Sequence, residues 1–169
     1  MKTLVLLRHL KSAWDEPGLE DHERPLAPRG HRAGERIRAH MEDAGISPQL
    51  VLCSSAVRAV QTWEAVRGGL PDDLELEIED GLYGASSESL LSRLNDVPDT
   101  VATAMLVAHN PGIGDLAAGL AGSADGDALE RMAEKYPTGG LATLTFAGPW
   151  AGLAWGDAKL VEYVVPREL

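Results

Sequence analysis

The sequence predicts an α/β fold, a three-layer sandwich in which helices flank a mostly parallel central sheet. Short apolar runs typical of buried strands alternate along the chain with amphipathic segments typical of helices. The 169 residues are enough to bury a substantial core and suit one domain. The chain contains no internal repeat, low-complexity tract or linker, so we expect a single domain over residues 1–169.

The first elements follow from the apolar pattern. Residues 3–8 are rich in Leu and Val without polar alternation, which predicts a buried strand. Prolines and Gly18 interrupt residues 11–28, so we expect a long loop of the kind that often covers a site. Residues 30–44 repeat apolar side chains along one face, which predicts a helix that Gly45 can end.

The next unit begins at a second short apolar strand, residues 49–53. Ser54 and Ser55 are suited to cap the helix that follows, which carries apolar side chains along one stripe from residue 59 to residue 70. Residues 74–78 indicate a third strand. This alternation of strand and helix is typical of a parallel sheet with crossover helices.

A further helix is expected to begin at Ser86, and residues 104–108 read as a fourth buried strand. Asn110 as N-cap and Pro111 as first helical residue indicate the start of the helix that follows this strand.

The last third of the chain predicts three more elements. Residues 126–135 indicate a helix, and residues 141–147 and 159–165 are expected to be strands on either side of a turn that contains Gly and Trp. We place the last strand at an edge of the sheet.

Composition excludes several classes of function. The formal net charge of −11 argues against a nucleic-acid binder, because a phosphate backbone requires basic surfaces. No apolar run reaches the roughly 18 residues of a membrane span, and the N-terminus lacks the features of a signal peptide. The single cysteine, Cys53, fits a reducing compartment. We expect a cytoplasmic protein that binds neither nucleic acid nor membrane.

Cationic side chains follow three of the predicted strands. Arg8 and His9 end the first strand, Arg58 lies in the first turn of the helix after the second, and His109 follows the fourth. Ligands of open α/β sheets bind outside the carboxyl ends of the strands, where these four groups are expected to meet. The helix near Ser55 adds a positive dipole end. The sequence therefore predicts a site for a doubly charged tetrahedral anion, with phosphate as the obvious candidate.

These residue types fit phosphoryl transfer. Arginine grips two phosphate oxygens with its planar fork, and a neutral imidazole can attack phosphorus. A metal site would need three or four ligands, and Arg8 and Arg58 would repel a cation beside His9 and His109. We therefore expect neither metal nor cofactor.

Three motifs resemble the histidine phosphatase superfamily: "LVLLRH" at the N-terminus, "SSAVRAVQT" after the second strand and "LVAHN" after the fourth. The segments "RPLAPRG" and "LYGAS" are most similar to bacterial SixA-type phosphohistidine phosphatases. The resemblance implies a phosphoglycerate mutase-like fold and a phosphohistidine intermediate on His9. It also implies that Arg8 and Arg58 bind phosphate, that His109 completes the pocket, and that the substrate is a phosphohistidine-bearing protein.

Two positions depart from that family. Leu10 replaces the glycine that usually follows the Arg-His pair, and Gly84 falls near the position where ester-cleaving relatives carry a carboxylic acid. General acid catalysis contributes about 10²–10⁴-fold, so its loss disfavours esters and favours phosphohistidine, whose imidazole leaves readily. Glu79 or Asp80 could supply the acid instead, and this alternative remains open.

Other assignments stay open at the level of sequence. Lys11 and Ser12 could contact substrate or simply begin the loop, and Arg24 could reach the pocket or brace the loop. Thr62 shares a helix face with Arg58 and could support it. His22 lies in an acidic cluster expected to be solvated.

Two rival functions also remain. One is a phosphatase of small phosphate esters, and the other is a phosphate-binding module without catalysis. The sequence decides neither the physiological substrate nor the oligomeric state.

Overall fold

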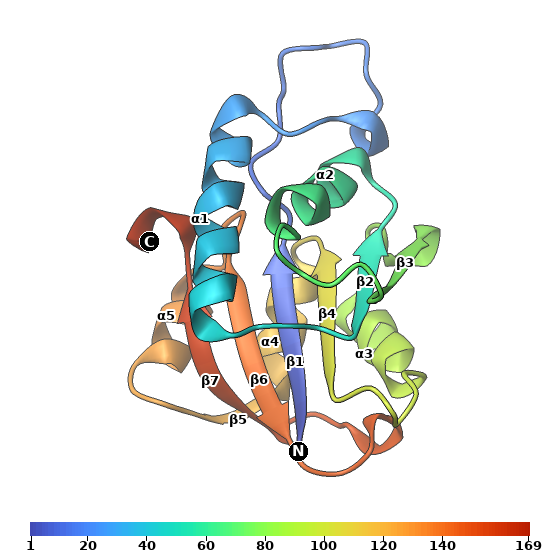
Figure 1. Ribbon diagram of the computed structural model, residues 1–169, viewed down its shortest axis with the longest axis vertical. Coiled ribbons are helices and arrows are strands. Elements are labelled where there is room, and N and C mark those ends of the chain that lie inside the picture. Colours follow the sequence, from blue (N-terminus) through green and yellow to red (C-terminus); the bar gives the residue numbers. More distant parts are fainter.

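A computed structural model describes residues 1–169. Seven strands form one sheet in the order β3-β2-β4-β1-β6-β7-β5 (Figure 1). The strands are β1 (Lys2–Arg8), β2 (Leu50–Ser54), β3 (Glu75–Glu79), β4 (Thr103–Ala108), β5 (Ala121–Ala124), β6 (Leu141–Phe146) and β7 (Ala158–Val164). The helices are α1 (Pro28–Ala44), α2 (Val57–Val66), α3 (Ser87–Asn95), α4 (Gly112–Leu120) and α5 (Ala128–Glu134). No helix is both long enough and apolar enough to cross a membrane.

The predicted sandwich is confirmed. The strands β3, β2, β4 and β1 run parallel, and β6 is antiparallel to both β1 and β7. Helices α1 and α2 cover one face of the sheet, and α3, α4 and α5 cover the other (Figure 1). Both faces are therefore buried, which is why the central strands read as continuous apolar runs.

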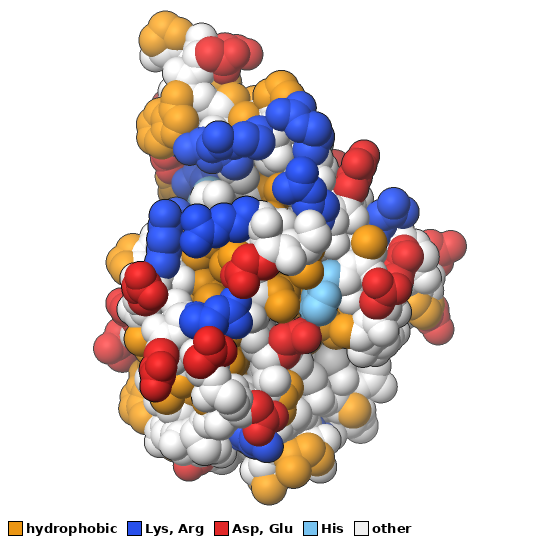
Figure 2. All heavy atoms as spheres, turned by 90° about the vertical axis from the view of Figure 1, so that its left-hand side faces the viewer, with side chains coloured by type: hydrophobic (Ala, Val, Ile, Leu, Met, Phe, Trp, Pro, Cys, Tyr) orange, Lys and Arg blue, Asp and Glu red, His pale blue; other side chains and the backbone are white.

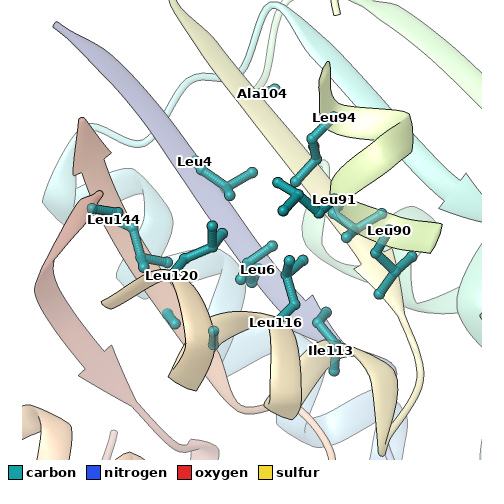
Figure 3. Close-up of a cluster of buried hydrophobic side chains, with 14 of the residues drawn as sticks. Leu4, Leu6, Leu90, Leu91, Leu94, Ala104, Ile113, Leu116, Leu120 and Leu144 are labelled. Carbon is teal, nitrogen blue, oxygen red and sulfur yellow. The ribbon is translucent and has the colours of Figure 1, made fainter. Parts of the chain in front are cut away.

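Successive side chains of β1 enter opposite cores. Leu4 and Leu6 pack with leucines of α3 and α4 (Figure 3), whereas Val5 and Leu7 pack with side chains of α1 and α2. All four are fully buried. Because both cores hold β1 from opposite sides, the end of this strand is a rigid position for the residues that follow it.

One strand prediction was wrong, and one strand was missed. The last strand, β7, lies between β6 and β5 rather than at an edge, because β5 pairs with it in parallel. β5 itself has the sequence AGSA, which has neither an apolar run nor β-branched residues, so no local signal marks it as a strand.

Three details of the helix starts also differ from the expectations. The N-cap of α2 is Ala56, whose N–H donates to Ser54 Oγ at 3.2 Å, so neither serine caps the helix in the expected way. In α4 the N-cap position is Pro111, and Asn110 Oδ1 accepts from the N–H of Gly114 at 3.1 Å. Helix α1 begins at Pro28 rather than Gly30. Ser86 caps α3 as predicted.

The segment 11–27 is a loop that contains a short 3-10 helix, η1 (Asp21–Glu23), and one antiparallel bridge between Ser12 and Leu26. It protrudes beyond the carboxyl ends of β1, β4 and β2 (Figure 1). Its position confirms the expectation of a loop near the predicted site.

Candidate active site

The sheet brings the two predicted histidines together. β1 and β4 are parallel neighbours with Arg8 opposite Ala108, so the residue after each strand is a histidine at the same edge. The N–H of His9 donates to the carbonyl of Ala108 at 3.0 Å, and the ring centroids of His9 and His109 are 5.2 Å apart. Because β2 is the next neighbour of β4, the first turn of α2 places Arg58 at this edge as well.

His9 is held as a neutral ring with one defined tautomer. Its Nδ1 lies 2.7 Å from the carbonyl oxygen of Leu10, which accepts only if Nδ1 carries the proton, so Nε2 keeps a free lone pair. Burial lowers the pKa of His9 to about 4, and the nearby Arg58, Arg8 and Arg24 also lower it. At neutral pH the ring is therefore uncharged, as a nucleophile must be.

His109 is also neutral at physiological pH. Its Nε2 lies 2.7 Å from Ser54 Oγ. Burial lowers its pKa to about 3, with further lowering from His9 and Arg58. Its Nδ1 is buried without a hydrogen-bond partner. The serine predicted as a helix cap thus orients the second histidine.

Each arginine near the two histidines donates hydrogen bonds to the protein from one part of its guanidinium group and leaves its Nε without a hydrogen-bond partner. Arg8 donates from Nη1 to the carbonyl of Tyr136 at 3.0 Å. Arg58 donates from Nη1 to the carbonyl of Asp21 at 2.7 Å and from Nη2 to the carboxylate of Asp21 at 2.9 Å. The Nε atoms of Arg8, Arg24 and Arg58 are buried without a hydrogen-bond partner.

Buried polar groups in proteins are normally paired, so a set of unpaired nitrogens requires a reason. Four of them belong to three arginines near the two histidines, Arg8, Arg58 and the loop residue Arg24, and each of these arginines lowers the pKa of His9 through its positive charge. Arginine N–H groups match the oxygens of phosphate. The unpaired nitrogens of Arg8, Arg58 and His109 therefore suit one tetrahedral dianion beside His9 Nε2, the class of ligand predicted from the sequence.

Two residues that sequence reasoning did not assign to the site contact its predicted groups, Asp21 from the loop and Tyr83 from the segment after β3. Asp21 belongs to the acidic cluster around His22 that was expected to be solvated, but its carboxylate pairs with Arg58 and accepts from the hydroxyl of Tyr83. These two hydrogen bonds lower the pKa of Asp21. Tyr83 stacks edge-on against His109, with ring centroids 5.5 Å apart. The sequence signal for Asp21 was its position three residues before Arg24, in a loop that was already expected to cover the site.

His22, taken as solvated, is half-buried, and its Nε2 lies 2.9 Å from Ser55 Oγ. Ser12 is buried and accepts from Nη2 of Arg24, so the structure favours the bracing role for Arg24. Lys11 is half-buried and lines a separate groove beside α1. Substrate contact by Lys11 or Ser12 stays a prediction.

Two further candidates are placed by the structure. Thr62 donates from its hydroxyl to the carbonyl of Arg58 at 2.7 Å, on the shared helix face that was expected, and it also accepts from the N–H of Leu10 at 2.9 Å. Glu79 is paired with Arg93, whose Nη2 is 2.8 Å away, and Asp80 is exposed at the start of a 3-10 helix, η2 (Asp80–Leu82). The structure contains no group of three or more His, Cys, Asp or Glu side chains that could hold a metal ion.

Comparisons with known proteins agree with this geometry. The chain is 41% identical over 167 residues to the uncharacterized protein Rv1276c of Mycobacterium tuberculosis (strain ATCC 25618 / H37Rv), covering 95% of this chain and 100% of that protein. The structure is similar to that of a candidate phosphohistidine phosphatase SixA from Nakamurella multipartitia, with a TM-score of 0.84, 29% identity and coverage of 98% and 96% of the two chains. A candidate SixA from Agrobacterium tumefaciens gives a TM-score of 0.79, 30% identity and coverage of 98% and 99%.

The family model described as the histidine phosphatase superfamily (branch 1) matches residues 4–91, which include Arg8, His9 and Arg58. The remaining member of the set, His109, is brought to the same edge by β4. Since the motifs, the fold and the relatives point to one group of proteins, the chain belongs to the histidine phosphatase superfamily and is a SixA-like phosphatase.

Proposed function

We propose that this phosphatase removes the phosphoryl group from phosphohistidine on a protein substrate, without a metal ion, through a covalent intermediate on His9. The lone pair of His9 Nε2 attacks phosphorus, and the bond between phosphorus and the substrate imidazole breaks. The electron pair of that bond stays on the substrate nitrogen, and the ring leaves as neutral imidazole because its other nitrogen carries a proton. Water then attacks the phosphorylated His9, releases inorganic phosphate and restores the neutral ring. Arg8, Arg58 and His109 bind the phosphoryl oxygens in both steps.

The observation that carries the substrate assignment is the state of the carboxylates around the site. Gly84, near the family's acid position, has no side chain. Asp21 is paired with Arg58 and Glu79 with Arg93, and these contacts lower the pKa of both carboxyls, so neither holds a proton at neutral pH. An alkoxide leaving group needs a proton from the enzyme, whereas a phosphohistidine ring that is protonated at its other nitrogen leaves as neutral imidazole without one. This arrangement favours a phosphorus–nitrogen bond as the substrate.

The ester alternative depends on Asp80, which is exposed and makes no side-chain hydrogen bond. The experiment is to compare kcat/KM for a phosphohistidine peptide with that for the same peptide carrying phosphoserine, each with and without EDTA. We expect the phosphohistidine peptide to be favoured by about 10²-fold or more, the size of the missing acid contribution, and EDTA to have no effect. Equal turnover of the two peptides would contradict the substrate assignment.

The covalent step has its own test. An alkaline quench during turnover should trap phosphate on His9, and His9→Ala should abolish release of phosphate. His31→Ala is the matched control, because His31 is exposed on α1 and should leave turnover unchanged. Tight binding of the peptide by the wild-type protein without release of phosphate would instead establish a non-catalytic module.

A further inference from the structure

A second cationic region lies on the side of the molecule formed by α1 and the C-terminal residues 165–167. Figure 2 shows most Lys and Arg side chains of this face gathered in its upper half. Here a groove of about 430 Å³ is bounded by the first half of α1, residues 135–138 and residues 165–167. Its cationic side chains are Lys11, Arg29, Arg32, Arg36, Lys135 and Arg167.

None of these six side chains forms an ion pair in the structure. Seven other Lys and Arg side chains of the chain pair with a carboxylate within 4.0 Å, among them Arg131, which pairs with Glu168 near the groove. The protein as a whole carries a formal charge of −11. Six like charges that form no ion pair repel one another when they are gathered in one groove, and a bound anion would relieve that repulsion.

The groove is distinct from the candidate active site but shares a wall with it. None of Arg8, His9, Arg58 or His109 lines it. The segment 135–139, however, faces both sites: Lys135 lines the groove, while the carbonyl of Tyr136 accepts from Arg8. The N–H of Gly139 also donates to the carbonyls of Arg8 and His9. A ligand in the groove would therefore contact the segment that holds Arg8 and His9, the two candidates at the end of β1.

The lining indicates the chemistry of the ligand. It includes four guanidinium groups and two ammonium groups but no aromatic side chain on which a ring could stack. Small-molecule sites are usually mostly apolar, which this groove is not, while its volume lies within their range of about 300–1,000 Å³. A chain of linked phosphates meets these conditions, because it is small, flexible and charged along its length. We propose that the groove binds a polyphosphate group, either free or as the phosphate chain of a nucleotide, through its phosphates alone.

The test is titration calorimetry with inorganic tripolyphosphate and, separately, with ATP. The double variant Arg32→Gln/Arg36→Gln removes two exposed groove charges that make no hydrogen bond. We expect it to weaken tripolyphosphate binding at least about tenfold, since the variant removes two guanidinium groups that would donate charge-assisted hydrogen bonds to phosphate oxygens. The matched control, Arg38→Gln/Arg67→Gln, removes the same charge outside the groove and should change the Kd less than about twofold.

The variant Arg58→Ala separates the groove from the phosphate site, because it weakens the latter and leaves the former intact. If Arg58→Ala still binds tripolyphosphate, the proposal is supported. If Arg58→Ala loses this binding while Arg32→Gln/Arg36→Gln keeps it, the ligand occupies the phosphate site and the proposal is overturned. Absence of binding at millimolar concentration also overturns it. The Kd for ATP should lie within about threefold of the Kd for tripolyphosphate. A tenfold lower Kd for ATP, or a Kd for a hexaglutamate peptide equal to that for tripolyphosphate, would refute recognition by phosphates alone. These readouts measure binding and do not depend on the proposed phosphohistidine activity.

Discussion

Thr62 offers a sharp test of how the nucleophile is held. Its buried hydroxyl accepts from the N–H of Leu10 at 2.9 Å, and the carbonyl of Leu10 accepts from His9 Nδ1 at 2.7 Å. The peptide of Leu10 is thus fixed on one side by Thr62 and fixes the tautomer of His9 on the other. Thr62→Val keeps the shape of the side chain and removes only this hydroxyl.

The expected cost follows from the donor that is left. An unsatisfied buried N–H costs about 1–3 kcal/mol, whereas the carbonyl of Arg58 keeps its partner in the backbone ladder of α2. We expect the free energy of unfolding to fall by about 2 kcal/mol, which for a chain of this size lowers Tm by roughly 4–8 °C. Because His9 loses its fixed orientation, kcat for the phosphohistidine peptide should fall by about 10- to 100-fold.

The assays are urea unfolding and steady-state kinetics on both variants at this position. Thr62→Ser retains the hydroxyl, so it should lose no more than about 1 kcal/mol for the missing methyl group and should keep near wild-type kcat. If Thr62→Val matches Thr62→Ser in stability within about 0.5 kcal/mol and in kcat, the Leu10 peptide does not depend on this hydroxyl and the reasoning fails.

The remaining predictions concern protonation and packing. In NMR spectra of the side-chain nitrogens, His9 and His109 should stay neutral between pH 8 and pH 5, with the His9 proton on Nδ1; titration of either ring near 6.5 would contradict their burial. The pKa values of both histidines are lower in the folded protein than in the unfolded chain, so the unfolded state takes up protons first as the pH falls. The free energy of unfolding should therefore decrease between about pH 7 and pH 5. An unchanged urea midpoint over this range would show that burial does not lower the two pKa values. Gly30→Ala should destabilise the protein although Ala favours helices by about 1 kcal/mol, since the added Cβ would lie 2.2 Å from the carbonyl oxygen of Lys11. Gly18→Ala is the control in thermal unfolding, because nothing lies within 4 Å of the added Cβ at that position. A Tm of Gly30→Ala at or above that of the wild type would show that the backbone at Lys11 shifts to accommodate the added methyl group.

The core of the site could be predicted because its chemistry is local to strand ends. Arg8 and His9 directly follow an apolar run, and a similar run precedes His109, so the parallel sheet alone brings the two rings to one edge. The limits appear where partners come from a loop. Asp21 lies 37 residues from Arg58 and 62 from Tyr83, and no periodicity connects such positions. β5 was missed for a related reason, since its pairing with β7 compensates for a weak local preference.

By itself, then, the sequence determined the alternation of strands and helices, the buried faces of both layers and the four groups at the carboxyl edge of the sheet. Each of these features depends on residue type and spacing within one segment. Only the tertiary structure decided which carboxylates are neutralised by arginines, which tautomer His9 adopts and where the unpaired cations form a groove. These features depend on contacts between segments far apart in the chain, whose side chains meet only after the sheet and its loops have packed.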